Sequence, residues 1–268
     1  MSSRTWLFGS NWKMNKTVPE AVEYARLLEK RLKGMQLDGA QVFVIPPFTA
    51  LGPVLRISRG SFLVGAQNMH WESAGPYTGE ISPLMLRDLG VDLVEIGHAE
   101  RRQYFNETDL DVNRKVISAI QSGLRPLICV GELLADKHYG VELETVSRQL
   151  RIAVHGVIDQ QASRLIVAYE PVWAIGDSGT TADNSHIQKM ISALRDVLRS
   201  AFSASVAESI PLLYGGSVFP EDAPSLLLST GVDGLFVGRA AIEAEAFADL
   251  ISDCLTEISS RGPGTTRV

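Results

Sequence analysis

Short runs of apolar residues, each closed by turn-forming residues, recur along the whole chain. Each run is nearly continuously apolar rather than alternating, which is typical of parallel strands covered on both faces. The runs predict eight strands, at residues 6–9, 41–45, 62–66, 92–96, 126–130, 165–169, 211–214 and 234–237. Amphipathic stretches with helical periodicity lie between them and predict helices. The clearest of these are residues 19–32, 112–120, 143–154 and 187–198.

This alternation of strands and helices, joined by short connections, predicts an α/β fold with a parallel sheet. Eight repeats over about 250 residues match a single closed (β/α)8 barrel, the TIM barrel. An open, doubly wound sheet is the alternative, but no Gly-x-Gly-x-x-Gly follows the first strand, where a dinucleotide-binding fold would place its phosphate turn. We therefore expect one barrel domain over residues 1–258 and a flexible C-terminal tail over residues 259–268.

Composition and charge narrow the class of protein. The chain has 268 residues, of which 45% are hydrophobic and 21% charged, as in ordinary globular domains. Its formal net charge of −6 argues against binding to nucleic acid or to an anionic membrane. No apolar run approaches the roughly 20 residues that span a bilayer, and the first residues lack a signal-peptide core. With only Cys129 and Cys254, neither a disulfide framework nor a cysteine-rich metal site is expected, and cytoplasm is the natural location.

Reactive side chains in such a barrel are expected just after the strands, at their carboxyl ends. Lys13 follows the first predicted strand, His98 the fourth and Glu170 the sixth. Taken singly, such a lysine is most often a solvated surface group, and such a histidine is more often structural than catalytic. A carboxylate directly after an apolar strand must be paired or functional, so Glu170 is harder to dismiss. Near the rim, Arg102 and Glu107 are expected to form a structural ion pair.

Glycine-rich turns follow the last two predicted strands. They are Gly215-Gly216-Ser217 after the seventh and Gly238-Arg239 after the eighth. The first of them could be merely a tight turn. Backbone N–H groups in such turns and at helix starts also bind anions, and two such turns at neighbouring strand ends favour a phosphate site.

Longer motifs at the strand ends are more specific than these single residues. They are Asn11-Trp-Lys-Met-Asn, Ala66-Gln-Asn, Tyr77-Thr-Gly-Glu-Ile-Ser, Ile96-Gly-His, Cys129-Val-Gly-Glu, Ala168-Tyr-Glu-Pro-Val-Trp-Ala-Ile-Gly, Tyr214-Gly-Gly-Ser-Val and Val232-Asp-Gly. In content and order they resemble the motifs of the triosephosphate isomerase family, over about residues 5–257. The resemblance implies an enzyme that moves a proton between adjacent carbons of a phosphorylated hydroxyketone through an enediolate, with no metal and no other cofactor.

The same resemblance implies a role for each matching residue at the reacting carbons. Glu170 matches the base that takes the proton and returns it to the neighbouring carbon. His98 matches the electrophile, and the residues after it suggest a helix start whose dipole would favour neutral imidazole. Lys13 matches the lysine that compensates the charge of the substrate and of the developing oxyanion. Asn11 matches the adjacent hydrogen-bonding residue.

Residues 171–180 resemble the lid that closes over the substrate in this family. Its first part is Pro171-Val172-Trp173, and Tyr214 and Ser217 match the residues that latch the closed form. The residues implied to hold the phosphate are Gly176, Ser217, Gly238 and Arg239. Closure would exclude water and suppress loss of phosphate from the enediolate.

The resemblance also implies a homodimer. In this family the third loop reaches from one subunit into the active site of its neighbour, and residues 75–82 match the tip of that loop. Thr78 is therefore expected to approach Asn11 and Lys13 of the partner subunit, across a two-fold symmetric interface.

Three departures from the family pattern bear on the substrate: Ala99 replaces a serine, the lid reads Ile-Gly-Asp-Ser-Gly-Thr-Thr, and Arg239 replaces the second glycine of a Gly-Gly pair. Isomerisation of dihydroxyacetone phosphate to D-glyceraldehyde 3-phosphate is the first candidate activity. Gly238-Arg239 also resembles the branch of the family that isomerises L-erythrulose 1-phosphate and D-erythrulose 4-phosphate, which is the alternative. A barrel that binds phosphate without turnover is a further alternative, but Lys13, His98 and Glu170 occur together, which speaks against it.

Overall fold

The computed structural model describes residues 5–175 and 181–260. Its strands all run parallel and close into a barrel in chain order, with β8 hydrogen-bonded to β1. The strands are β1 (Trp6–Asn11), β2 (Ala40–Ile45), β3 (Leu63–Ala66), β4 (Leu93–Ile96), β5 (Arg125–Val130), β6 (Ile166–Tyr169), β7 (Leu212–Tyr214) and β8 (Gly234–Val237). The predicted barrel is confirmed, and each of the eight predicted runs coincides with one of these strands.

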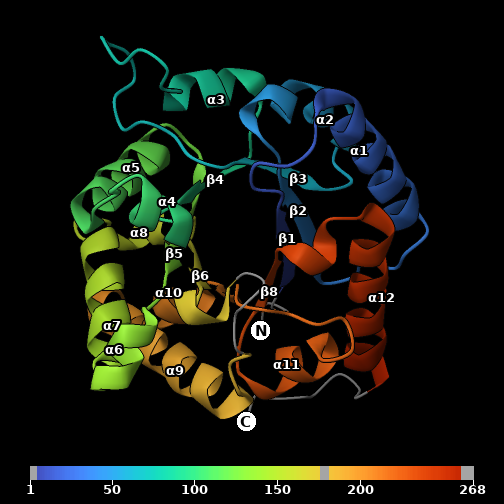
Figure 1. Ribbon diagram of the computed structural model, residues 1–268. Coiled ribbons are helices and arrows are strands. Elements are labelled where there is room, and N and C mark those ends of the chain that lie inside the picture. The colour runs from blue at the N-terminus through green and yellow to red at the C-terminus, as the bar shows by residue number, and fades with distance from the viewer. Residues whose placement is uncertain (1–4, 176–180, 261–268) are drawn as a thin grey trace.

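Helices surround the barrel, each in the connection between two strands or after the last one (Figure 1). The four clearest predicted helices are α1 (Val18–Lys33), α5 (Asp109–Gln121), α7 (Glu142–Ala153) and α9 (Asn184–Ala201). The other α-helices of the described residues are α2 (Leu51–Ser58), α3 (Pro83–Leu89), α4 (Ala99–Tyr104), α6 (Leu134–Tyr139), α8 (Asp159–Ala162), α10 (Ala204–Ser209), α11 (Ala223–Ser229) and α12 (Ala244–Ser260). Several connections, such as the one between β5 and β6, hold more than one helix, so the alternation is less simple than predicted.

Local sequence explains where the longer helices begin. Thr17 precedes α1, and its backbone N–H and hydroxyl both donate to the carboxylate of Glu20, which forms a capping box beside Pro19. Thr108 and Asp111 form the same arrangement at the start of α5. These caps satisfy N–H groups that have no partner within the helix, so both helices begin at defined positions next to the strand ends.

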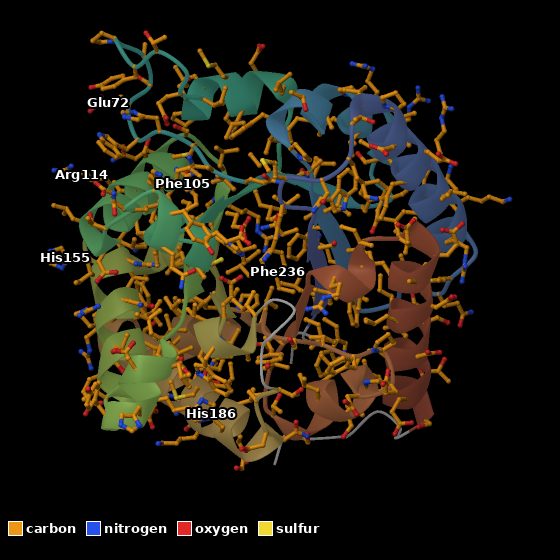
Figure 2. All side chains as sticks on the ribbon, viewed as in Figure 1. Glu72, Phe105, Arg114, His155, His186 and Phe236 are labelled. Atoms are coloured by element: carbon orange, nitrogen blue, oxygen red, sulfur yellow. The ribbon has the colours of Figure 1, made fainter. Side chains whose placement is uncertain are left out.

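The barrel interior is filled by every second residue of the strands. Figure 2 labels Phe236, which lies within the ring of strands, where its ring stacks on Phe43 at a centroid distance of 5.7 Å. On β4, Leu93 belongs to this interior cluster, whereas Val94 packs in the layer between strands and helices. Because side chains alternate along a strand, Glu95 also faces the barrel interior.

The last described helix, α12, extends slightly beyond the expected end of the barrel domain. Helix α12 reaches Ser260, two residues past the expected end of the domain at residue 258, and residues 261–268 of the expected tail lie outside the described residues. Along the described chain, we find no helix that is both long enough and apolar enough to span a membrane.

Candidate active site

A cavity of about 790 Å³ opens at the carboxyl ends of the strands. Side chains from strand ends far apart in the sequence line it together, among them Asn11, Lys13, His98, Glu170, Ser217, Gly238 and Arg239. The structure thus brings together the four residues expected to act at the reacting carbons and three of the four expected to hold phosphate. The fourth, Gly176, lies outside the described residues.

Glu170 and His98 face each other across the floor of this cavity. The His98 Nε2 to Glu170 Oε1 distance is 3.8 Å, and both side chains are buried. The backbone N–H of Glu170 donates to the Val130 carbonyl at 2.8 Å, which fixes the start of the turn after β6. Gly215 gives the carboxylate its space, because a Cβ there would lie 2.9 Å from Glu170 Cγ. Glu170 Oε2 is buried without a hydrogen-bond partner among the described residues, so it is free to act on a substrate.

His98 is the N-cap of helix α4, as its sequence context suggested. Gly97 precedes it with φ of +80°, a conformation that suits glycine, and the His98 Nδ1 accepts a hydrogen bond from the Glu100 N–H at 3.2 Å. Nδ1 must therefore be unprotonated, which directs the ring proton to Nε2, the atom that faces Glu170.

Burial and the neighbouring carboxylates act on the pKa of His98 in opposite directions. Burial disfavours the imidazolium form, but the negative charges of Glu170 and Glu95 outweigh burial and raise the pKa of His98. The helix dipole, on which the expected neutral ring was based, is thus opposed by Glu95 and Glu170, which lie close to the His98 ring. An ionised Glu95 would work against a neutral His98.

Lys13 is held in a strained backbone conformation at the end of β1. Its φ of +53° is left-handed, which is uncommon for a residue with a side chain. The Lys13 N–H donates to Asn11 Oδ1 at 2.6 Å, and Gln67 Nε2 donates to the Lys13 carbonyl at 2.7 Å. Its ammonium group lies 2.7 Å from Glu100 Oε1 and borders the cavity. These contacts fix a positive charge beside His98.

Glu95 is a buried carboxylate that sequence reasoning missed. The Asn11 side-chain amide donates to both of its oxygens, at 2.8 Å and 3.1 Å, and Cys129 Sγ lies 3.7 Å from Oε1. One side-chain atom each of Glu95, His98 and Glu170 lie within 4.8 Å of one another, so the three side chains form one buried cluster. A signal was present: a carboxylate at an inward-facing position of an apolar strand needs the same explanation as Glu170.

Comparison with known proteins identifies the family. The sequence model of the triosephosphate isomerase family matches residues 6–254, which is most of the chain and includes every residue of the site described above. The chain belongs to the triosephosphate isomerase family. It is therefore a sugar-phosphate isomerase, and the predicted resemblance is confirmed.

Relatives within the triosephosphate isomerase family carry two different names. The chain is 43% identical over 247 residues to a triosephosphate isomerase of Caldanaerobacter subterraneus subsp. tengcongensis, covering 92% of this chain and 98% of that protein. It is 46% identical over 245 residues to an L-erythrulose-1-phosphate isomerase of Mesorhizobium japonicum, covering 91% and 94%. An L-erythrulose-1-phosphate isomerase of Brucella abortus is 42% identical over 260 residues, covering 96% and 99%. Identity alone does not separate the two groups.

The first residues of the lid segment are anchored beside the cavity. After Pro171, residues Val172–Ala174 form a 3-10 helix, and Trp173 Nε1 donates to the buried carboxylate of Glu132 at 2.7 Å. Ser217 donates from both its N–H and its hydroxyl to the Ala174 carbonyl, at 3.0 Å and 2.7 Å. Ser217 therefore already contacts this segment.

Tyr214 and Lys137 are two further residues that concern the lid segment. Tyr214 is fully buried, and its hydroxyl has no hydrogen-bond partner among the described residues. Lys137 Nζ lies 3.6 Å from the centroid of the Trp173 ring, a cation–π contact between α6 and the lid segment. Glu132 is the last residue of the motif that begins at Cys129, and the sequence suggested no role for it. In the structure its carboxylate accepts the hydrogen bond from Trp173.

The predicted ion pair between Arg102 and Glu107 is wrong. Arg102 Nη1 pairs with Asp109 at 2.6 Å, and its Nε donates to the Gly97 carbonyl just before His98. Glu107 is buried and pairs with Lys115 instead. The two residues lie on either side of a turn, so nearness in the sequence did not bring the charged ends together.

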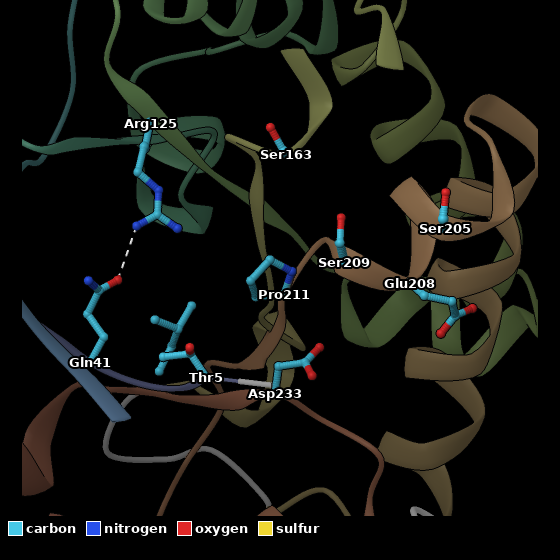
Figure 3. A pocket seen from close by; sticks show the side chains of 10 residues that line it. Thr5, Gln41, Arg125, Ser163, Ser205, Glu208, Ser209, Pro211 and Asp233 are labelled. Atoms are coloured by element: carbon cyan, nitrogen blue, oxygen red, sulfur yellow. Dashed lines mark hydrogen bonds between the residues drawn. The ribbon is translucent and has the colours of Figure 1, made fainter. Parts of the chain in front are cut away.

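A second cavity, of about 500 Å³, lies at the opposite, amino-terminal end of the strands. Figure 3 shows Gln41 and Arg125, near the starts of β2 and β5, joined by a hydrogen bond of 3.1 Å. Asp233 lines the same cavity and pairs with the buried Arg195 at 3.0 Å. Residues at this end of a TIM barrel normally serve stability, and these contacts fit that role.

Proposed function

We propose that the chain carries out proton transfer through an enediolate, with Glu170 as base and His98 as electrophile. The observation that carries this proposal is their separation of 3.8 Å in one cavity with Lys13. A carboxylate oxygen of Glu170 takes a proton from the hydroxyl-bearing carbon next to the carbonyl; the electron pair of that C–H bond forms a carbon–carbon double bond, and the π pair of the carbonyl moves onto its oxygen. The Nε2–H of His98 and the Lys13 ammonium stabilise this oxygen. Glu170 then returns the proton to the former carbonyl carbon; the hydroxyl proton of the neighbouring carbon passes by way of His98 to the first oxygen, so that the carbonyl and hydroxyl groups exchange places.

The phosphate is placed at the other side of the cavity. The turns at residues 215–217 and 238–239 line that side, and Lys13 supplies positive charge in a protein of net charge −6. In the first turn Gly216 can offer its backbone N–H, whereas those of Gly215 and Ser217 donate to the carbonyls of Tyr169 and Ala174. With the phosphate held near β7 and β8, the carbon chain points across the barrel toward β4, because β4 and β8 are opposite each other in the closed order. Gly176 would complete the grip from the lid.

The departures from the family pattern favour a four-carbon ketose phosphate as the preferred substrate. Arg239 follows Gly238 and lines the cavity where the family pattern has a second glycine, and Ala99 removes a hydroxyl next to His98. Relatives named L-erythrulose-1-phosphate isomerase at 46% and 42% identity support this choice. The competing candidate is isomerisation of triose phosphates, supported by the shared catalytic set and by a relative of that name at 43% identity.

Steady-state kinetics with the pure protein test the choice of substrate. The substrates are dihydroxyacetone phosphate, glyceraldehyde 3-phosphate, L-erythrulose 1-phosphate and D-erythrulose 4-phosphate. We expect the larger kcat/KM for the erythrulose phosphates and a changed ratio in Arg239→Gly, because specificity is differential transition-state binding. If Arg239→Gly lowers kcat/KM by the same factor for all four substrates, the role of Arg239 is restricted to phosphate binding. Higher efficiency with triose phosphates in the wild type would assign the chain to the competing activity.

The proposal includes assembly into a homodimer through the loop before α3. Residues 72–80 are all exposed, and in Figure 1 this loop extends away from the body of the barrel. Exposed apolar side chains continue on and around α3, namely Tyr77, Leu84, Met85 and Leu89. Such a surface suits a subunit interface. Thr78, at the tip, would then lie beside Asn11 and Lys13 of the partner subunit.

We also propose that the enzyme acts in the cytoplasm. Its two cysteines, Cys129 and Cys254, are both buried and unpaired, which suits a reducing compartment. Fractionation of cells that produce the protein, with isomerase activity as the marker, tests this location.

A further inference from the structure

A second buried carboxylate lies next to the proposed catalytic base. Glu95 is 1% exposed, and one of its oxygens lies within 4.8 Å of ring and carboxylate atoms of His98 and Glu170. No lysine or arginine of the described residues forms an ion pair with it; its partners are the Asn11 amide and the Cys129 thiol. A buried carboxylate without a cationic partner is costly to keep ionised.

The proposed reaction makes a negative charge at Glu95 still less favourable. Glu170 has to be ionised to act as a base, and the enediolate adds negative charge on the substrate nearby. Like charges in one buried site disfavour simultaneous ionisation. Lys13 lines the cavity, but its ammonium group pairs with Glu100 at 2.7 Å rather than with Glu95.

Glu95 also determines how the Asn11 side chain is oriented. Asn11 Nδ2 donates to both Glu95 oxygens, and Asn11 Oδ1 accepts from the Lys13 N–H at 2.6 Å. An amide flip would place oxygen against the carboxylate and NH2 against an N–H donor, so only one orientation fits both contacts.

We propose that Glu95 is a positioning residue that works as a neutral carboxylic acid. In that form it fixes the Asn11 amide and leaves Glu170 as the only ionised carboxylate beneath the reacting carbons. The proposal goes beyond the assignment of base and electrophile and does not depend on whether the substrate has three or four carbons.

The surroundings of Glu95 place its titration near neutrality. Burial and the charge of Glu170 raise the pKa of Glu95 to about 7, while His98, Lys13 and the Asn11 amide oppose the rise. The other titratable groups around the site are Cys129 on β5, whose thiol pKa is raised by burial, and Glu100 on α4. As pH rises through this range Glu95 loses its proton, and a second negative charge then opposes formation of the enediolate.

The test measures kcat and kcat/KM against pH, from about pH 5.5 to about pH 9.5, with the best substrate of the wild type. Glu95→Gln keeps an acceptor for Asn11 and stays neutral, so it should retain wild-type activity at low pH and lose the fall of activity on the alkaline side. Glu95→Leu removes the acceptor and should lower kcat by about tenfold or more at every pH. Asp92→Asn is the matched control: it neutralises a carboxylate just before β4, at the opposite end of the barrel, and should leave the profile unchanged.

A second measurement tests the neutral acid without relying on turnover. The infrared difference between wild type and Glu95→Gln at about pH 6 should contain the C=O band of a protonated carboxylic acid, and this band should vanish as Glu95 ionises at higher pH. The band together with the altered pH profile supports the proposal. The proposal is overturned if the pH–activity profile of Glu95→Gln has the same shape as that of the wild type, or if the carboxylic acid band is absent at low pH. An inactive wild type that still shows the band would overturn the proposed isomerase function and leave the acid form of Glu95 established.

Discussion

At the scale of single residues, the site depends on how charge is distributed among a few buried groups. The positive charge of Lys13 is paired with Glu100, His98 Nδ1 is occupied by a helix N–H, and Glu170 Oε2 has no partner among the described residues. Of these three residues, Glu170 is the one with a buried side-chain atom that lacks a partner, and such an atom is costly unless a substrate or function requires it. The geometry thus separates the group that reacts from those that support it.

We predict that Glu170→Gln lowers kcat by at least about a thousandfold while the protein stays folded. The amide keeps the size of the side chain but cannot accept the proton. Turnover of the best substrate and thermal unfolding of the same samples provide the measurement. Glu144→Gln, which neutralises an exposed carboxylate on α7, serves as the control and should match the wild type in both. Near wild-type turnover by folded Glu170→Gln would remove Glu170 from the mechanism.

At the scale of elements, strands were predictable and polar contacts between elements were not. Continuous apolar runs determine parallel strands, so all eight were found, and with them the strand ends that carry Lys13, His98 and Glu170. Glu95 was missed because one polar residue in an apolar run does not change the strand prediction. Arg102 was assigned the wrong partner because side-chain pairing depends on where α4 ends and α5 begins, which a hydrophobic pattern locates only within a few residues.

The lid segment provides a prediction at this scale. Trp173→Phe removes the hydrogen bond from Nε1 to the buried Glu132 and leaves a carboxylate oxygen with one donor fewer. We expect a loss of about 1–2 kcal/mol in the free energy of unfolding, and a smaller further loss when Glu132→Gln is combined with it, because the two residues share one interaction. Denaturant unfolding of both single variants and the double variant measures the coupling. Additive losses would contradict the shared contact.

At the scale of the whole molecule, one barrel contains both the cavity and the exposed surface that the proposed dimer would cover. The loop of residues 72–80 follows β3 and is tied at its base by a hydrogen bond of 2.8 Å from the His70 N–H to the Ile81 carbonyl. The His70 ring also contacts the ring of Tyr77, with centroids 4.1 Å apart. A loop that is ordered at its base and exposed along its length can present a fixed tip to another subunit. Met14, next to Lys13 in the sequence, is 96% exposed. A barrel that leaves such groups uncovered is expected to be completed by a second copy.

The prediction for the whole molecule is that activity requires the dimer. Thr78→Arg places a charge and a long side chain at the loop tip, which an interface beside Lys13 cannot accommodate without repulsion between like charges. We expect sedimentation to show a monomer and kcat to fall by about a hundredfold or more. Glu72→Gln, in the same exposed loop but away from its tip, should remain dimeric and active. Dilution of the wild type should lower its specific activity as the dimer dissociates. A wild type that sediments as a monomer with undiminished activity would show that each barrel works alone.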